Sequence, residues 1–470
     1  MPPKSDLGVA GAGGRSKVED DPIARVVAFY LPQYHPIPEN DRWWGEGFTD
    51  WTNVRRARPL FEGHDQPKIP TTLGYYDLRD VDRHHAQAAL ARANGVAGFC
   101  YYAYWFGGRR LLERPLDLVA SNPDLAMPYA ICWANEPWSR RWDGSESEIL
   151  MEQRHSPERD AAFIEDHATH LADPRYLRVG GRPLLLIYRA ELLADPRRTT
   201  DMLRERAMRL GLGDLFLGMV QSFGSWDPIG YGCDAAVEFP PHPHNLGLDA
   251  RATAYRTPRN HAESRVWAPA YEDLIRVMLS RPVPQFTWFR TVMPGWDNTP
   301  RRGRRGIVYV GATPAVFRQW LEEVLRGTYL FGRPGERLVF INGWNEWAEG
   351  AYLEPDASHG DAFLRAVRAA LEATDAFAHD TARLLEAGPR KGGLLEDARL
   401  AWTGRSARSR FMPPALGPDE EGADLDLDDA RAIKVTLWAL GKVRAIPPLY
   451  IALRNAARLL RNIRRRWAKR

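Results

Sequence analysis

Eight short runs of apolar residues recur along the first three quarters of the chain, and more polar stretches separate them. Each run is nearly continuous in apolar residues rather than alternating, which is typical of strands buried on both faces of a parallel sheet. Strands that alternate with helical stretches predict parallel βαβ units. The runs are residues 25–31, 96–102, 128–133, 183–188, 215–221, 235–239, 285–292 and 337–342.

Several of the intervening stretches carry the amphipathic pattern of helices. About eight strand–helix units over roughly 350 residues predict an α/β fold, a (β/α)8 TIM barrel. A doubly wound sheet is the alternative, but no glycine-rich phosphate-binding turn follows any run, which favours the barrel. The expected helices are residues 78–94, 158–171, 201–210, 271–279 and 314–325.

The barrel is expected to span residues 23–374, and the chain changes character on both sides of it. Residues 1–22 have no apolar signal-peptide core and predict a disordered lead. Residues 375–415 predict a helical or irregular wrap, and residues 416–429, with seven acids, predict an acidic linker. No apolar run approaches the ~18 residues of a transmembrane helix.

The last segment, residues 430–470, is strongly basic. It holds 12 Lys or Arg and no Asp or Glu, so the remaining 52 basic and 60 acidic residues give the rest of the chain a charge of −8. The pattern predicts a basic amphipathic helical tail, broken at Pro447 and Pro448. An anionic membrane surface is the favoured target, and the acidic body or a protein partner is the alternative. No nucleic-acid motif accompanies the tail, so we expect no nucleic acid.

The cysteines and the absence of a leader favour a reducing compartment. Cys100, Cys132 and Cys233 are an odd number and far apart, which argues against a disulfide framework. The expected location is the cytoplasm, with the tail on the inner face of the cytoplasmic membrane as a further expectation. No Cys and His set has zinc-site spacing, and an Asp-x-Asp string near Asp424 lies in the acidic linker, so no metal or cofactor is expected.

Polar and aromatic residues follow the C-terminal ends of seven of the eight runs, where barrel enzymes build their active sites. Aromatic faces beside carboxylates and amides suit sugars, which have flat C–H faces and hydroxyl edges. The bulky core of a large barrel is the alternative reason for the aromatics. The candidate substrate-binding residues are Tyr34, His35, Trp44, Glu46, Asp50, Trp51, Tyr102, Trp105, Trp133, Asn135, Glu136, Trp138, Glu238, Trp296 and Asn345, with Asp297 as a further carboxylate.

The preferred catalytic pair is Glu346 and Glu349, in the string WNEWAEG after the eighth run. Breaking a glycosidic bond needs a proton donor and a second group that stabilises or attacks the anomeric centre, and two carboxylates usually share this work. Trp344 and Trp347 could raise the pKa of one glutamate, as a general acid requires. The alternative is that one glutamate only begins a helix and interacts with its dipole.

Three long strings resemble the WbsX-like family: FYLPQYHPIPENDRWWGEGFTDWTNV, CWANEPWSRRWDG and INGWNEWAEGAYLEPD. Members are described as glycosyltransferases or glycoside-hydrolase-like proteins of bacterial surface polysaccharide gene clusters. The resemblance spans residues 26–370. More distantly, the chain is similar to glycoside hydrolase family 99, the endo-α-mannosidases and endomannanases, which are (β/α)8 barrels.

The more distant resemblance implies roles for both glutamates. The catalytic string of family 99, Glu-Trp-His-Glu-Gly, aligns with residues 346–350, where Ala348 stands in place of the histidine. Glu349 would be the general acid/base. Glu346 would deprotonate the substrate 2-hydroxyl, which attacks the anomeric carbon to give a 1,2-anhydro sugar, with overall retention.

The expected protein is therefore a retaining carbohydrate-active enzyme of O-antigen or capsule biosynthesis, with α-mannosides among its candidate substrates. Its partner would be an oligo- or polysaccharide, with a lipid-linked glycan as one form. The first alternative is a WbsX-type glycosyltransferase that uses an activated or lipid-linked sugar donor. The second is a non-catalytic glycan-binding scaffold.

Overall fold

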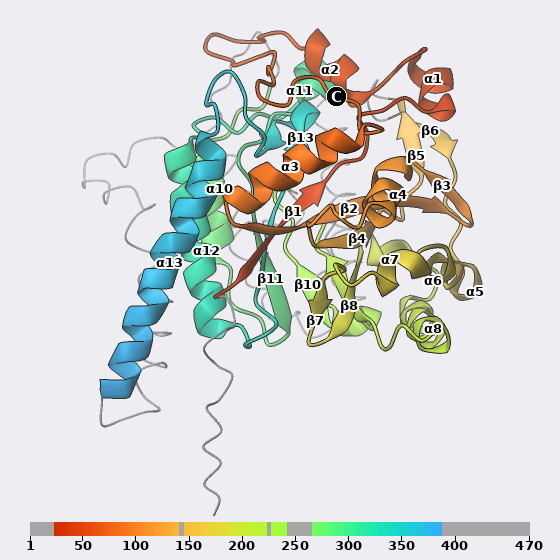
Figure 1. The fold of residues 1–470 in the computed structure, drawn as a ribbon. Coiled ribbons are helices and arrows are strands. Elements are labelled where there is room, and N and C mark those ends of the chain that lie inside the picture. The colour runs from red at the N-terminus through yellow and green to blue at the C-terminus, as the bar shows by residue number, and fades with distance from the viewer. Residues whose placement is uncertain (1–22, 141–144, 223–226, 242–265, 388–470) are drawn as a thin grey trace, which may run out of the picture. The chain divides into compact units, whose positions relative to one another are not determined.

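The computed structural model describes residues 23–140, 145–222, 227–241 and 266–387 (Figure 1). Eight strands within these residues pair in parallel, each with the next, and the last pairs with the first, so the sheet closes. The predicted (β/α)8 barrel is confirmed. Its strands are β1 (Arg25–Tyr30), β2 (Val96–Phe106), β4 (Tyr129–Trp133), β8 (Arg182–Ile187), β9 (Phe216–Val220), β10 (Ala235–Val237), β11 (Thr287–Val292) and β12 (Leu338–Ile341).

Each barrel strand coincides with one of the eight apolar runs, because strands enclosed by a layer of helices are buried on both faces. All residues of β4 and β9 are buried, and both strands belong to one continuous hydrophobic core. The largest difference is in β2, which continues to Phe106 and forms a hairpin with β3 (Arg109–Leu111). Gly107 and Gly108 turn that hairpin with positive φ, a conformation that favours glycine.

Four of the five predicted helices are present with shifted ends, and one is divided. Residues 157–172 form three short helices, and His167, whose ring Nδ1 lies 2.8 Å from the carbonyl oxygen of Phe163, stands between the last two. Most of the remaining helices have a capping side chain or a proline at their N-terminus. The outer elements are α3 (Val81–Ala93), α4 (Arg114–Ser121), α5 (Pro157–Asp160), α6 (Ala162–Asp166), α7 (Ala168–Ala172), β7 (Arg178–Val179), α8 (Pro196–Arg209), α10 (Tyr271–Ser280), α12 (Pro314–Phe331) and α13 (Ala362–Ala387).

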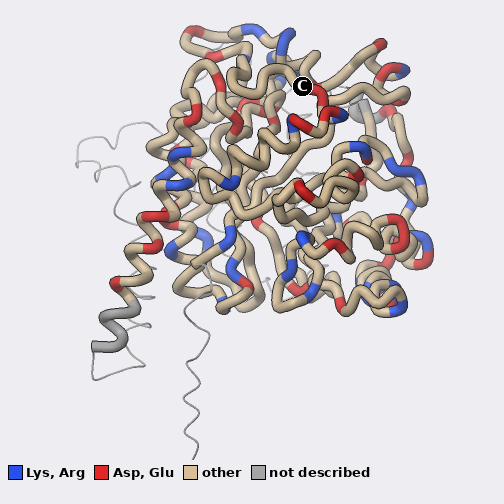
Figure 2. Tube along the Cα trace, viewed as in Figure 1, with Lys and Arg blue, Asp and Glu red and all other residues tan. Residues whose placement is uncertain are grey.

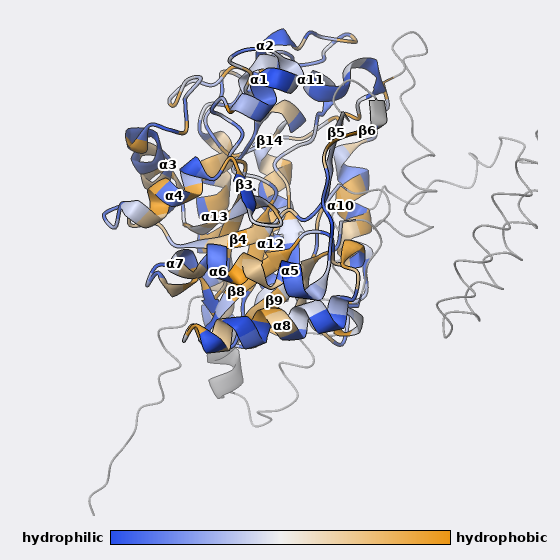
Figure 3. Ribbon diagram, turned by 90° about the vertical axis from the view of Figure 1, so that its right-hand side faces the viewer, coloured by the Kyte–Doolittle hydropathy of each residue, from blue (hydrophilic) through white to orange (hydrophobic). Residues whose placement is uncertain are grey.

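Short elements cover the end of the barrel to which the C-terminal ends of the strands point (Figure 1). The short elements at this end of the barrel carry mainly hydrophilic residues, whereas hydrophobic residues concentrate in the strands and along α10 and α12 (Figure 3). Acidic and basic residues are interspersed over the outer helices (Figure 2). The short elements are α1 (Pro38–Trp44), α2 (Asp50–Arg56), β5 (Trp138–Arg140), β6 (Ser145–Met151), η1 (Ala190–Leu192), η2 (Ile229–Tyr231), α11 (Thr299–Arg302), η4 (Gly303–Arg305), β13 (Asn345–Glu346), η5 (Trp347–Glu349) and β14 (Ala351–Tyr352).

The chain divides into two units, residues 1–412 and 413–470, and every described residue belongs to the first. Helix α13 runs without interruption across residues 374 and 375, where the sequence predicts that the barrel ends and the wrap begins. The predicted lead, the acidic linker, the basic tail and the wrap beyond residue 387 lie outside the described residues. No helix in the described part is both long and apolar enough to cross a membrane. All three cysteines are buried and none forms a disulfide.

Candidate active site

Glu346 and Glu349 lie in one tight hairpin just beyond the end of β12. Glu346 belongs to β13, which pairs with β14, and η5 connects the two strands and ends at Glu349. Gly350 closes the turn with φ +62°, and a Cβ at this position would lie 2.9 Å from the backbone nitrogen of Asp297. Only glycine therefore fits the turn that brings both glutamates to one side.

One buried arginine contacts three carboxylates at this place. Arg301 of α11 donates from Nη2 to Asp50 at 2.5 Å and to Glu346 at 3.1 Å, and from Nη1 to Glu349 at 2.7 Å. Asp50 is the first residue of α2, which follows β1, whereas α11 follows β11 and the glutamates follow β12. Three adjacent strand ends thus meet at a single guanidinium group, whose planar fork suits paired carboxylates.

Burial changes the protonation of this cluster. Burial raises the pKa of Glu346 to about 8, against the charge of Arg301 and with the charges of Glu349 and Asp50 adding to the rise. Burial likewise raises the pKa of Glu349, with Arg301 opposing and Asp50 adding. Burial alone would lower the pKa of Arg301, but the three carboxylates outweigh it and hold that pKa well above its usual value. The pair of glutamates therefore retains a proton into the neutral range.

Tyr34 and Asn345 fix the glutamate hairpin to the end of β1. The Asn345 side chain accepts a hydrogen bond from Leu31 N at 2.8 Å and donates one to Leu31 O at 3.0 Å. The Tyr34 hydroxyl donates to Asn345 O at 2.5 Å and accepts from Trp347 N at 3.1 Å. Both predicted substrate-binding side chains thus use their polar atoms on the backbone, so we assign them a positioning role.

Asp297 connects the hairpin to α11. Its backbone N donates to Glu349 O at 2.6 Å, and its carboxylate accepts from the N and hydroxyl of Thr299, the first residue of α11. His64 at 2.8 Å and Gln66 at 2.6 Å complete the shell of that carboxylate. Burial would raise the pKa of Asp297, but these hydrogen bonds outweigh it and lower that pKa. Asp297 therefore holds Arg301 and Glu349 on a common support.

Glu354 forms a second buried support, behind the hairpin. Its carboxylate accepts hydrogen bonds from Trp347 Nε1 at 2.6 Å, Gln87 Nε2 at 2.7 Å and the Tyr76 hydroxyl at 2.8 Å. Burial raises the pKa of Glu354 to about 7, against the effect of these donors. The carboxylate, held by Gln87 and Tyr76, fixes the indole of Trp347, which lies between the two candidate catalytic glutamates.

Residues from three further strand ends lie near the cluster. Burial, then the charges of Tyr188 and Glu346, raise the pKa of Tyr102, and burial, then the charges of Glu136 and Glu349, raise that of Tyr188. The two tyrosines are in edge-to-face contact, with ring centroids 6.1 Å apart. Glu136 forms an ion pair with Arg189 at 2.9 Å. Tyr102, Tyr188 and Glu136 therefore share the electrostatic environment of the two glutamates.

Four other predicted residues are committed to packing or to ion pairs elsewhere. Trp105 Nε1 donates to Asp166, and Trp133 stacks on Phe163, both tryptophans being fully buried. Asn135 uses both ends of its side chain on the backbone of Arg189. Glu238 is fully buried and bound by Arg281 at 2.6 Å and by Arg290 at 2.8 Å. None of these four contacts Arg301.

The remaining predicted residues surround the site at varying depth. Trp51 is buried with its ring centroid 4.4 Å from that of Tyr34 and 5.6 Å from that of Trp347. Burial lowers the pKa of His35, whose Nδ1 contacts Pro36 O. Trp44 packs on Phe48, Trp138 packs edge-on against Tyr104, Trp296 is half-buried, and Glu46 is exposed.

Arg301, Glu354 and Tyr188 were not among the sequence candidates. Carboxylates and aromatics are the residue types expected at a sugar site, and Arg301, in the PRRGRR stretch after the seventh run, is neither. Glu354 lies in the third of the long strings, YLEPD, which was the available signal. No group of three or more His, Cys, Asp or Glu among the described residues is placed to hold a metal ion.

A search of protein families matches residues 26–367 to the family described as glycosyltransferase WbsX. The chain belongs to this family. Protein WxcX of Xanthomonas campestris pv. campestris, described as uncharacterized, is 47% identical over 351 residues, which cover 74% of this chain and 50% of that protein. The chain thus spans about half the length of the curated relatives that it matches. The predicted family is confirmed, and membership supports a carbohydrate-active enzyme.

Two solved structures resemble this chain over most of their own length. A glycoside hydrolase-like protein has a TM-score of 0.48 and 16% identity, covering 74% of this chain and 94% of its own. A family 99 endo-α-mannosidase from Bacteroides thetaiotaomicron has a TM-score of 0.46 and 15% identity, covering 76% and 98%. The barrel assignment itself rests on the closed strand pairing described above.

Proposed function

We propose that this chain cleaves or transfers glycosidic bonds with retention of configuration, using Glu346 and Glu349. The observation that carries the proposal is the buried cluster in which Arg301 contacts both glutamates and Asp50. General acid–base catalysis needs one protonated and one ionised group near neutral pH. A pair of carboxyls with raised pKa values beside one arginine shares a proton near neutral pH, and the proposed cycle starts with that proton on Glu349 although burial raises the pKa of Glu346 to about 8.

The roles follow from depth in the site and from the resemblance to family 99. Glu349 has the more exposed side chain, 23% against 8% for Glu346, so it is placed to meet the leaving group and the incoming acceptor. In the first step Glu349 gives its proton to the leaving oxygen. Glu346 takes the proton of the 2-hydroxyl, whose oxygen displaces the leaving group from the anomeric carbon.

The second step reverses these proton transfers. Glu349 removes a proton from water or from an acceptor hydroxyl, and the resulting nucleophile opens the 1,2-anhydro sugar at the anomeric carbon. Glu346 returns its proton to the 2-oxygen. Two displacements at one carbon give retention, and both glutamates end in their starting protonation states. Arg301 stabilises whichever carboxylate is ionised at each stage.

The experiment that tests this proposal uses the Glu349→Gln and Glu346→Gln variants beside the wild-type chain. Substrates are α-linked mannosides and fragments of bacterial surface polysaccharides, and NMR follows the anomer formed. We expect retention in the wild type and a rate loss of at least about 100-fold in each variant. A variant that keeps the wild-type rate on a turned-over substrate would exclude its glutamate from catalysis.

The proposal extends to the biosynthesis of bacterial surface polysaccharides, with the glycan carried on a lipid as one form of the substrate. A transferase that uses an activated sugar donor is the second candidate. The specific observation in its favour is a pocket beside α2 lined by Arg55 and Arg56, for which the described residues provide no carboxylate partner. The family description agrees with transfer, and hydrolysis and transfer share the chemistry of the first step.

A further inference from the structure

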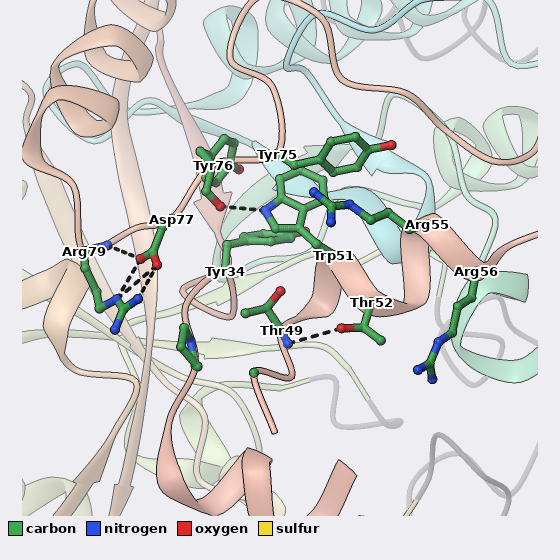
Figure 4. Close-up of a pocket in the computed structure, with 12 residues that line it drawn as sticks. Tyr34, Thr49, Trp51, Thr52, Arg55, Arg56, Tyr75, Tyr76, Asp77 and Arg79 are labelled. Atoms are coloured by element: carbon green, nitrogen blue, oxygen red, sulfur yellow. Dashed lines mark hydrogen bonds and ion pairs between the residues drawn. The ribbon is translucent and has the colours of Figure 1, made fainter. Parts of the chain in front are cut away.

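A pocket of about 460 Å³ opens beside α2, close to the candidate active site (Figure 4). Arg55 and Arg56, in the last turn of α2, form one side together with Tyr75, and Asp77 and Arg79 form the other. The rings of Tyr34 and Trp51 lie between the two sides. Neither Glu346 nor Glu349 lines the pocket, so its chemistry is separate from theirs.

The charges in this pocket do not balance. Its only acidic lining residue, Asp77, is already bound by Arg79, with Nη2 to Oδ2 at 2.6 Å and Nε to Oδ1 at 3.0 Å. The Arg55 guanidinium lies 4.1 Å from the ring centroid of Tyr75. Within the described ranges, no carboxylate pairs with Arg55 or Arg56. Two exposed positive charges therefore remain available at one edge of the pocket.

One layer of buried side chains, Tyr34 and Trp51, lies between the pocket and the glutamate hairpin. The Tyr34 hydroxyl accepts a hydrogen bond from Trp347 N, and the Trp51 ring lies 5.6 Å from the Trp347 ring. Helix α2 itself begins with Asp50, which pairs with Arg301, and ends with the two free arginines. A ligand bound at the arginines thus lies one short helix away from the catalytic cluster.

We propose that this pocket binds the phosphate groups of a phosphorylated glycan substrate, and that the attached sugar enters the site of Glu346 and Glu349. Guanidinium groups bind phosphate through two parallel hydrogen bonds, and the two unpaired arginines supply the charge. The volume lies within the range of about 300–1,000 Å³ that is usual for small-ligand sites. The hydroxyls of Thr49 and Thr52, which also line the pocket, add neutral donors.

This inference deepens the proposed function and rests on it for the sugar end of the ligand. Phosphate binding by itself needs no turnover and is measured separately. A diphosphate can come from a nucleotide-activated sugar or from a lipid carrier, and both present the same group to the arginines. The structure assigns the phosphate chemistry, and the source is distinguished by the ligands compared below.

The test is calorimetric titration of the full-length chain with inorganic pyrophosphate. The decisive variant is the double substitution Arg55→Gln and Arg56→Gln, and the matched control is Arg92→Gln, an exposed arginine of α3 that lies outside the pocket. Both arginines are exposed in the last turn of α2, so the double variant is expected to fold, which circular dichroism verifies. The basic tail is present in every variant, so differences between them isolate the pocket.

We expect the dissociation constant for pyrophosphate to rise about tenfold for each arginine lost, or about 100-fold in the double variant. It should be unchanged in Arg92→Gln and in Glu349→Gln. Equal affinity of the wild type and the double variant, or no saturable binding by the wild type, would overturn the proposal. Loss of turnover in Glu349→Gln with pyrophosphate binding intact separates this result from that for the catalytic pair.

Two further titrations identify the source of the phosphate. A nucleoside diphosphate that binds more tightly than pyrophosphate indicates a nucleotide-activated sugar. A short-chain prenyl diphosphate that does so indicates a lipid carrier. In either case the double variant must weaken the tighter ligand. Binding of a sugar carboxylate such as glucuronate in place of pyrophosphate would refute the assignment to phosphate.

Discussion

Replacing Arg301 by glutamine should change the pH dependence of both stability and activity. The substitution removes the only described cation that contacts Asp50, Glu346 and Glu349 together. Since the charge of Arg301 lowers the pKa of both glutamates, its loss should raise those pKa values further. At neutral pH the ionised fraction of Glu346, which must act as base and whose pKa is already about 8, would then fall further. We therefore expect the rate at neutral pH to fall and the rising limb of the pH–rate profile to move to higher pH.

The size of the effect follows from the burial of the cluster. The side chains of Arg301 and Glu346 are 10% and 8% exposed, so solvent screens them little. Removing one partner of a buried ion pair costs about 3–5 kcal/mol in the free energy of unfolding. Protonation of the carboxylates that have lost Arg301 reduces this cost. The reduction is about 1.4 kcal/mol for each pH unit below their pKa. The destabilisation should therefore be largest at alkaline pH and smallest at acidic pH.

Urea denaturation at about pH 5, 7 and 9, with the pH–rate profile on any turned-over substrate, measures both effects. Arg301→Lys keeps the charge without the fork and should lie between the wild type and the glutamine variant. Arg198→Gln, which removes an exposed ion pair with Glu158, is the control and should cost less than about 1 kcal/mol. Equal stability and equal pH dependence in Arg301→Gln and wild type would refute the buried cluster.

Three further outcomes are expected. Trp133→Ala should lower the free energy of unfolding by about 3–5 kcal/mol in urea titrations, whereas Trp138→Ala, at the partly exposed rim, should mainly raise KM for a glycan. In the wild type, Glu354 binds its proton more tightly in the folded chain than in the unfolded chain, because its pKa is raised from 4.5 to about 7. Its contribution to the free energy of unfolding is therefore complete below pH 4.5 and is lost as the pH rises through about 7. Glu354→Gln should flatten that part of the stability profile. Deleting residues 430–470 should release the chain from the membrane fraction, and unchanged fractionation would contradict the predicted membrane-binding tail.

Most of the barrel was predictable because its strands are buried on both faces. Burial on both faces leaves nearly continuous apolar runs in the sequence, as in β4 and β9, and these runs need no partner to be recognised. The hairpin that extends β2 was not predicted, since its pairing depends on two glycines with positive φ rather than on apolar pattern. The division of the helix expected at residues 158–171 was not predicted either, since apolar periodicity alone does not mark breaks such as those at Ala161 and His167.

The candidate site was predictable in outline, because barrel sites lie at strand ends, but not in its pairings. Arg301 and Asp50 are 251 positions apart, so no local pattern connects them. The aromatic residues show the same limit. Trp133 and Trp138 are five positions apart, yet one stacks in the core on Phe163 and the other lies at the rim. Composition gives the number of tryptophans, whereas the direction of each side chain depends on the strand or hairpin that carries it.

Helix α2 joins the two parts of the proposed substrate site. Its first residue, Asp50, pairs with Arg301 inside the cluster, and its last turn carries Arg55 and Arg56 at the pocket. Seven residues of helix span about 10 Å, so the proposed phosphate pocket and the glutamate cluster lie within the length of one phosphorylated glycan. Because the two ends act on different groups, the arginine variants should weaken recognition of phosphorylated substrates while the glutamate variants abolish chemistry. These two separate effects are expected if one phosphorylated glycan occupies both the pocket and the glutamate site.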